Sequence, residues 1–216
     1  PELANGEVAK TQILFDGIYN HSEVWINGHS LGYRPFGYVA FYYDLTPFLN
    51  TDGSDNVIAV HVDRSRYVDS RWYTGSGIYR NVKLVITGQV HVPIWGSTIL
   101  TPEVTSERAK VLISTEIRND STQVRVLNVS TTLLDGSGLN VGRDMKRLEI
   151  AARSTELLRQ EVIVTNPQLW DIDNPNLYFA QTEVRGEGQL LDSKSTRVGI
   201  RSLRNDAKTG FFLNGR

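Results

Sequence analysis

The amino-acid sequence predicts an all-β protein built from β-sandwiches, and three observations carry that prediction. Apolar residues recur with a period of two along several segments, as in half-buried strands. Turn signals that contain glycine separate these segments at short intervals. No long segment shows the apolar period of 3.6 residues that an amphipathic helix requires. Many short strands joined by tight turns are typical of sandwich architecture.

Three segments justify the predicted strands. From Val111 to Ile117, every second residue is Val, Ile or Thr, so these side chains face one way and the polar ones between them face the other. The apolar run over residues 57–62 (VIAVHV) is predicted to be a buried sandwich strand. The segment 147–160 (RLEIAARSTELLRQ) fits either a short helix or two strands meeting near Ser154, and we adopt the strands.

The turns agree with this interpretation. Asn27-Gly28 lies between two strand-like segments, and Asn-Gly is the strongest short signal for a hairpin because both residues tolerate a positive φ. Asp52-Gly53 and Asp135-Gly136 mark further turns. A break in the pattern at residues 89–95 predicts two units, and the second, residues 92–203, has the size of an immunoglobulin-like sandwich.

Composition excludes several classes of function. The 216 residues are 40% hydrophobic and carry 23 basic against 24 acidic side chains, which excludes a disordered chain and a basic nucleic-acid-binding surface. The sequence contains no run of about 18 apolar residues, so it predicts no membrane-spanning helix. The chain has no cysteine, so disulfides, thiol nucleophiles and cysteine-ligated zinc are excluded. Its four histidines lack the spacing of a metal site.

The C-terminal residues predict a larger protein. Residues 211–213 (FFL) lead into Asn214-Gly215 and then the final Arg216, which looks like one hairpin arm and its turn without the second arm. Such a strand is expected to be unpaired, and unpaired strands are a liability that proteins avoid. We therefore expect the chain to be a fragment.

The densest polar and aromatic segment is residues 63–80 (DRSRYVDSRWYTGSGIYR). Its carboxylates and guanidinium groups suit the hydroxyls of a sugar, its indole suits a pyranose face, and its glycines allow close backbone approach. The alternative is a structural corner in which arginines pair with aspartates. Gly75-Ser76-Gly77 is too short for a phosphate-binding loop, and no carboxylate pair or serine triad is evident.

Several ordered motifs resemble glycoside hydrolase family 2, which contains β-galactosidases and β-glucuronidases. The segment 72–84 (WYTGSGIYRNVKL) resembles the end of the family's sugar-binding jelly-roll domain, and 15–49 (FDGIYNHSEVWINGHSLGYRPFGYVAFYYDLTPFL) and 56–65 (NVIAVHVDRS) resemble its earlier strands. Residues 167–184 (PQLWDIDNPNLYFAQTEV) resemble the second, immunoglobulin-like domain. Residues 198–216 (VGIRSLRNDAKTGFFLNGR) resemble the join to the catalytic (β/α)₈ barrel.

The resemblance implies an organisation of the chain. Residues 1–91 would be the C-terminal part of the jelly-roll domain, 92–203 the immunoglobulin-like domain, and 204–216 a linker with the first hairpin arm of the barrel. The fold class is therefore a partial jelly-roll (galactose-binding-like) sandwich followed by an immunoglobulin-like sandwich. Trp170 and Tyr178 are expected to pack against the neighbouring domain.

The resemblance also implies a function. Family members hydrolyse terminal β-glycosides with retention, using two Glu carboxylates about 5–5.5 Å apart. Both lie in the barrel, so no catalytic residue is expected here and the chain alone is expected to be inactive. Asp69, Arg71 and Trp72 are the expected substrate contacts.

The expected partners are a β-galactoside or related sugar, the protein's own barrel and a second copy of the chain. No cofactor is expected in this fragment, and Na⁺ or Mg²⁺ would belong to the full enzyme. The alternative function is a stand-alone carbohydrate-binding or adhesion module without hydrolase activity.

Overall fold

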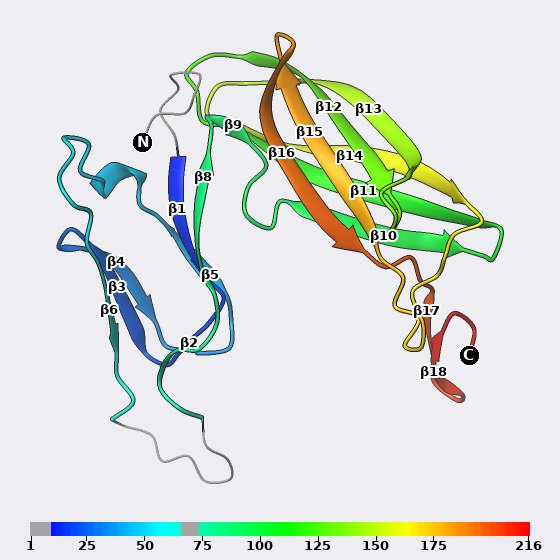
Figure 1. The fold of residues 1–216 in the computed structure, drawn as a ribbon, viewed down its shortest axis with the longest axis horizontal. Helices are drawn as coiled ribbons and strands as arrows, with labels where there is room; N and C mark the ends of the chain where they lie inside the picture. The colour runs from blue at the N-terminus through cyan, green and yellow to red at the C-terminus, as the bar shows by residue number, and fades with distance from the viewer. Residues whose placement is uncertain (1–9, 66–73) are drawn as a thin grey trace. The chain divides into compact units, whose positions relative to one another are not determined.

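A computed structural model gives the fold, and it describes residues 10–65 and 74–216 (Figure 1). The described residues contain strands, turns and one short 3₁₀ helix, Thr46–Phe48, with no α-helix among them. None of their helical residues could therefore cross a membrane. The chain divides into two compact units, Pro1–Gly88 and Gln89–Arg216. The all-β prediction is confirmed.

The first unit is a sandwich of two three-stranded antiparallel sheets and one short ladder. One sheet has the order β5-β1-β8, the other has the order β4-β3-β6, and β2 pairs with β7. The strands are β1 Lys10–Phe15, β2 Ile18–Tyr19, β3 Ser22–Ile26, β4 His29–Arg34, β5 Phe41–Asp44, β6 Ile58–Val62, β7 Gly77–Ile78 and β8 Val82–Thr87. Asn27 and Gly28 form the β3–β4 turn with φ of 50° and 82°, which confirms the predicted hairpin.

The core of the first unit covers only part of each sheet. Ile13 on β1 and Ile26 on β3 are buried in it. Directly opposite them in the register, Leu84 on β8 and Ile58 on β6 are exposed. A groove of about 890 Å³ lies between these two edge strands and is lined by both sheets.

The prediction of a buried strand at residues 57–62 is therefore wrong. A strand does form there, but β6 pairs with β3 on one side only and so forms the edge of its sheet. Ile58 is exposed although it lies opposite the buried Ile26, and Val57 before it is exposed as well, whereas Val60 and Val62 are partly buried against the core. The apolar run reports a strand correctly, while its burial depends on a neighbouring layer.

The second unit is a larger sandwich. One sheet has the order β10-β11-β14, with β9 also paired to β11, and the other has the order β13-β12-β15-β16 (Figure 1). The strands are β9 Val90–His91, β10 Ser97–Val104, β11 Arg108–Asn119, β12 Arg125–Leu134, β13 Asn140–Ile150, β14 Ser154–Thr165, β15 Tyr178–Gly186 and β16 Gln189–Val198. The segment predicted as two strands supplies the end of β13 and the start of β14, as expected.

Apolar side chains from both sheets form the core of this unit. Val111, Ile113 and Ile117 of β11 are buried, together with Thr115, which confirms the predicted alternation. A polar link crosses the core as well: the Thr131 hydroxyl on β12 donates to Gln160 Oε1 on β14 at 2.8 Å. Gln160 Nε2 donates to the Asp144 carbonyl on β13 at 2.8 Å, so one side chain joins the two sheets.

Two expectations for the C-terminal part need correction. The strand β18 (Gly210–Leu213) is paired, because it forms a hairpin with β17 (Leu203–Asp206). Asp206 Oδ1 accepts the Lys208 and Thr209 amides and so holds that turn. Tyr178 belongs to the core of its own unit, where its hydroxyl accepts the Gln168 amide at 2.8 Å. Tyr178 lies on the inward face of β15, where alternate residues are buried, so its burial requires no neighbouring domain.

Candidate functional site

The three predicted substrate contacts, Asp69, Arg71 and Trp72, lie outside the described residues, so their contacts stay a prediction. The two ends of the segment that contains them are described, at residues 63–65 and 74–80. The candidate site consists of these two ends and the side chains that they contact.

The first end follows β6 and begins with an Asx-type turn. Asp63 Oδ1 accepts the Ser65 amide at 2.9 Å and the Ser65 hydroxyl at 2.6 Å. The Asp63 amide donates to the His21 carbonyl at 3.3 Å, which ties the end of β6 to the chain before β3. Next to it, the Arg64 guanidinium lies 5.9 Å from the ring centroid of Tyr19. The first end therefore rests on the ring of Tyr19.

The second end is fixed to the same region. β7 pairs with β2, with Gly77 opposite Tyr19. The Tyr79 hydroxyl donates to the Gly37 carbonyl at 2.8 Å, and the Arg80 guanidinium lies 5.4 Å from the Tyr79 ring. Tyr79 thus secures this end to the sandwich.

Four aromatic rings connect the two ends, and we call them the ring cluster: Tyr19, Phe36, Tyr38 and Tyr79. Tyr38 is its centre, with ring centroids 5.3 Å from Tyr19, 5.6 Å from Phe36 and 6.4 Å from Tyr79. These tilted and edge-to-face arrangements are the favoured geometries of aromatic pairs. The cluster combines β2, the loop between β4 and β5, and the residue after β7.

Gly37 makes the close packing of the ring cluster attainable. A Cβ atom at this position would lie 2.5 Å from Cδ2 of Tyr19 and 3.0 Å from its Cα. The second of these atoms is backbone, so the loop could not keep its place with a larger residue. Position 37 therefore requires glycine because there is no space for a Cβ atom.

Sequence reasoning placed the site in residues 63–80 and missed the contribution of residues 33–43 (YRPFGYVAFYY). That segment has six aromatic residues among eleven, which was the available signal. No periodicity links it to Tyr19 or Tyr79, so their contact follows from the sheet topology.

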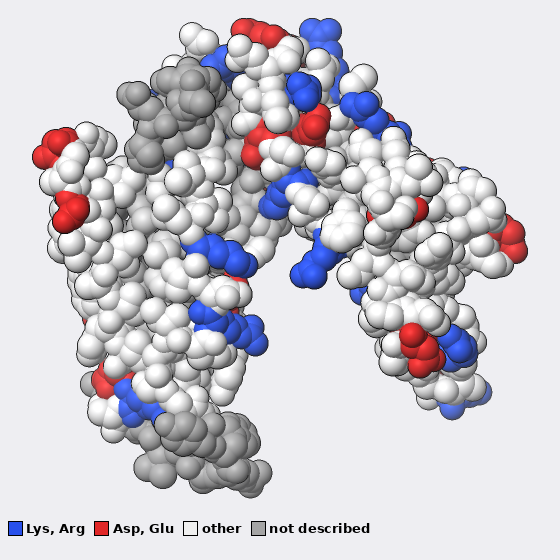
Figure 2. All heavy atoms as spheres, viewed as in Figure 1, with Lys and Arg blue, Asp and Glu red and all other residues white. Residues whose placement is uncertain are grey.

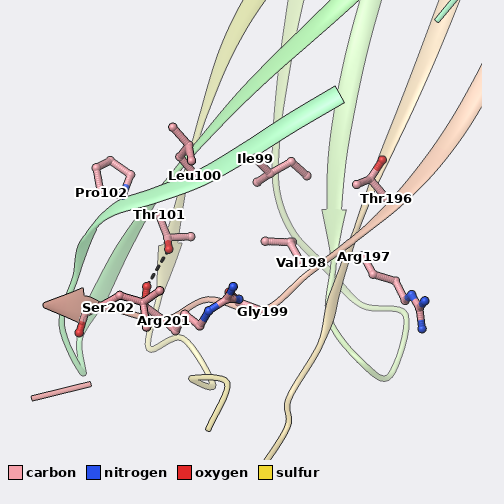
Figure 3. Close-up of a pocket in the computed structure, with 11 residues that line it drawn as sticks. Ile99, Leu100, Thr101, Pro102, Thr196, Arg197, Val198, Gly199, Arg201 and Ser202 are labelled. Atoms are coloured by element: carbon pink, nitrogen blue, oxygen red, sulfur yellow. Dashed lines mark hydrogen bonds between the residues drawn. The ribbon is translucent and has the colours of Figure 1, made fainter. Parts of the chain in front are cut away.

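A second hollow lies in the other unit, between the middle of β10 and the C-terminal end of β16 (Figure 3). It has a volume of about 550 Å³, and the Thr101 hydroxyl reaches across its base to the Arg201 carbonyl at 2.8 Å. Arg201 also lies 5.2 Å from the Trp170 ring. The described residues that line the hollow include no carboxylate or imidazole, so they offer no acid or base for glycoside cleavage.

The carboxyl groups with shifted pKa values serve turns and ion pairs. Hydrogen bonds from Ser54 lower the pKa of Asp52, and hydrogen bonds from Ser137 and Leu139 lower the pKa of Asp135. The hydrogen bond from Arg216, at 2.7 Å, lowers the pKa of Asp171. A general acid needs a raised pKa, and these groups are shifted in the opposite direction.

The described residues also do not supply a side-chain set for a metal ion. No three His, Cys, Asp or Glu side chains come together within residues 10–65 and 74–216. On the face shown in Figure 2, Lys and Arg side chains are interspersed with Asp and Glu, and uncharged residues cover most of the surface. No step through Na⁺ or Mg²⁺ is assigned to these residues.

Comparison with known proteins decides the family. Residues 91–201 match the profile of glycosyl hydrolases family 2, and residues 3–88 match the sugar-binding domain of the same family. The chain belongs to glycoside hydrolase family 2. The resemblance carried by its sequence motifs is thereby confirmed.

Relatives in this family include enzymes with two different names. The β-galactosidase BoGH2A of Bacteroides ovatus is 44% identical over 205 residues, which are 95% of this chain and 24% of that protein. A putative β-glucuronidase of Formosa agariphila is 37% identical, over 95% of this chain and 19% of that protein. The chain thus spans about a quarter or less of the length of these family 2 relatives.

Solved structures confirm the fold class, a partial jelly-roll followed by an immunoglobulin-like sandwich. A family 2 member from Bacteroides cellulosilyticus matches with a TM-score of 0.91 at 32% identity, over 96% of this chain and 28% of that one. A β-glycosidase from Bacteroides vulgatus matches with a TM-score of 0.84 at 36% identity, over 99% of this chain and 26% of that one. The ring cluster lies in the unit that matches the sugar-binding domain of family 2.

Proposed function

We propose that this chain forms the sugar-binding and spacer domains of a retaining glycosidase that hydrolyses terminal β-galactosides in carbohydrate metabolism. The observation that carries the proposal is the match of both units to family 2, together with 44% identity to a β-galactosidase. The first unit contacts the substrate through the segment between β6 and β7, and the second unit is a rigid spacer. Cleavage is performed by a catalytic barrel of the full-length protein.

The division of labour follows from the chemistry of the reaction. Retaining hydrolysis needs a carboxylic acid and a carboxylate about 5–5.5 Å apart, and we assign both to the barrel. The role of Asp69, Arg71 and Trp72 is to hold the non-reducing sugar by charge-assisted hydrogen bonds and ring contact. The proposal includes no cofactor held by this chain. It leaves Na⁺ or Mg²⁺ to the full enzyme.

The test compares chromogenic substrates on the full-length enzyme. We expect hydrolysis of a nitrophenyl β-galactoside well above that of the β-glucuronide, and no hydrolysis by the 216-residue chain alone. Asp69→Ala and Trp72→Ala should raise KM by about tenfold each, the equivalent of about 1.4 kcal/mol of lost binding, with kcat less affected. A full-length enzyme that prefers the glucuronide would overturn the assignment to galactosides.

A second candidate function is a stand-alone carbohydrate-binding or adhesion module. The exposed rings beside residues 63–80 favour it as much as they favour a glycosidase, because sugar binding alone explains them. Absence of hydrolysis by the full-length protein, combined with retained sugar binding, would select this alternative.

A further inference from the structure

The ring cluster exposes more aromatic surface than the fold of the first unit requires. Phe36 is 61% exposed, Tyr38 52% and Tyr79 44%. Their centroid distances of 5.6 and 6.4 Å make them one continuous patch. A contiguous exposed patch of this kind marks an interaction site in a soluble protein.

The patch is held in place by specific contacts. The Tyr79 hydroxyl donates to the Gly37 carbonyl, the ring of Tyr19 packs against that of Tyr38, and a side chain at position 37 would collide with Tyr19. A ligand would therefore meet rings that are already ordered. Surfaces that are preorganised in this way lose little conformational entropy on binding.

The chemistry of the patch fits a carbohydrate. Ring faces without charge suit the apolar C–H faces of pyranoses, and the Tyr38 hydroxyl can exchange hydrogen bonds with sugar hydroxyls. The Arg80 guanidinium beside the Tyr79 ring adds fixed donors. A nucleic acid would require a larger basic field than a chain with a formal net charge of −1 provides.

The size of the patch argues against a protein partner. Three aromatic side chains that are each about half exposed present roughly 300 Å². A stable protein–protein interface needs about 800 Å² from each partner. An extended oligosaccharide, by contrast, needs only a few ring contacts along its length.

We propose that the ring cluster is a second sugar-contact surface, which binds the sugar units next to the one that the enzyme cleaves in a β-linked oligosaccharide. This inference rests on the proposed glycosidase function. It adds contacts to the sugar units that follow the terminal one, made by residues other than the predicted substrate contacts. The predicted contacts in residues 66–73 hold the terminal sugar, and Phe36, Tyr38 and Tyr79 hold the chain that follows it. The cluster would make the enzyme prefer oligosaccharides to simple nitrophenyl glycosides.

The direct test is binding of β-1,4-linked galactotetraose to the 216-residue chain, measured by titration calorimetry and by saturation-transfer NMR. Phe36→Ala and Tyr38→Ala should each weaken binding about 2–10-fold, the range expected for one aromatic contact. Tyr38→Phe keeps the ring and should retain most of the affinity. Circular dichroism checks that each variant is folded.

The matched control is Phe211→Ala on β18. Phe211 is the same residue type and is 62% exposed, yet it lies outside the ring cluster and in the other unit. It should leave binding unchanged, and maltotetraose, with its α-linkages, should bind at least several-fold more weakly than the β-linked probe. Equal effects of Phe36→Ala and Phe211→Ala would overturn the proposal.

Two other results would also overturn it. One is no detectable binding up to about 10 mM sugar, which is weaker than any useful contact. The other is a concentration-dependent dimer that forms without sugar and is abolished by the ring variants, because the occupant would then be a second copy.

The outcome is separable from that of the proposed function. Galactoside hydrolysis by the full-length enzyme without oligosaccharide binding at the rings would refute only this inference. Ring-dependent binding without hydrolysis would refute only the glycosidase assignment.

Discussion

The polar link through the core of the second unit can be tested by Gln160→Leu. Gln160 is almost fully buried, and its amide bonds Thr131 Oγ1 and the Asp144 carbonyl, each at 2.8 Å. Leucine preserves most of the volume and removes both of these hydrogen bonds, together with a longer one of 3.3 Å from Gln160 Nε2 to the Val129 carbonyl. Each short bond is worth about 1 kcal/mol net, and the Asp144 carbonyl left without its amide donor adds about 1 kcal/mol or more. We expect a loss of about 2–3 kcal/mol in the unfolding free energy of this unit.

The assay must report on the second unit alone, because a chain of two units need not unfold in one step. Native-state hydrogen exchange of the β12 and β14 amides gives that local free energy. Gln181→Leu is the control, since this residue is exposed on β15 and the change should stay within about 0.5 kcal/mol.

A double-mutant cycle with Thr131→Val isolates the link itself. The Thr131 hydroxyl also lies 2.9 Å from the Thr182 hydroxyl, so it keeps one partner when Gln160 is replaced. We expect a coupling energy of about 0.5–1.5 kcal/mol between Gln160 and Thr131. Additive effects, or a loss below about 0.5 kcal/mol for Gln160→Leu, would refute the reasoning that this side chain joins the sheets.

Three further predictions follow from single contacts. Ile13→Ala should lower the free energy of unfolding, measured by thermal denaturation, by about 2–5 kcal/mol, and Leu84→Ala by less than about 1 kcal/mol. The two residues are paired in the register, but Ile13 is 4% exposed and Leu84 is 58% exposed. Equal losses would mean that β8 is covered in solution. The hydrogen bond from Arg216 lowers the pKa of Asp171, so this pair stabilises the fold above the ordinary aspartate pKa of about 3.9, and the stabilisation is lost as the pH falls through the folded pKa. Asp171→Asn should therefore make the melting temperature depend less on pH below about pH 4, and an unchanged pH dependence contradicts this. Gly37→Ala should cost about 1–3 kcal/mol by overpacking and change the near-ultraviolet dichroism of the tyrosines, whereas an unchanged spectrum would show that the loop has room.

Local signals in the sequence predicted the strands and turns well. Asn27-Gly28 specifies a hairpin because the turn itself needs two positive φ angles, and no distant residue can change that requirement. The alternation from Val111 to Ile117 specifies one buried face because the period of a strand is fixed at two. Both features depend on a few neighbouring residues, so a single sequence contains all the information they need.

Burial and the candidate site depended on distant partners. The run 57–62 is more apolar than the alternating segment 111–117, yet β11 is central in its sheet and β6 lies at an edge. The ring cluster likewise joins positions 19, 36, 38 and 79, which are brought together by the β2–β7 pairing and the loop before β5. The residue types in 63–80 indicated a sugar-binding segment, and only the fold shows which aromatic rings lie next to its two ends.

The position of the ring cluster constrains how variants there should be interpreted. Arg64 at one end of the segment 66–73 lies over Tyr19, and Tyr79 at the other end contacts Tyr38, so both ends rest on one set of rings. Under our proposal, removing a ring either weakens sugar contact directly or displaces the segment that we propose to hold the terminal sugar. Loss of direct contact raises KM for oligosaccharides alone, because a monosaccharide glycoside does not reach the rings. Displacement of the segment raises KM for both substrates, and the ratio of the two effects distinguishes contact from positioning.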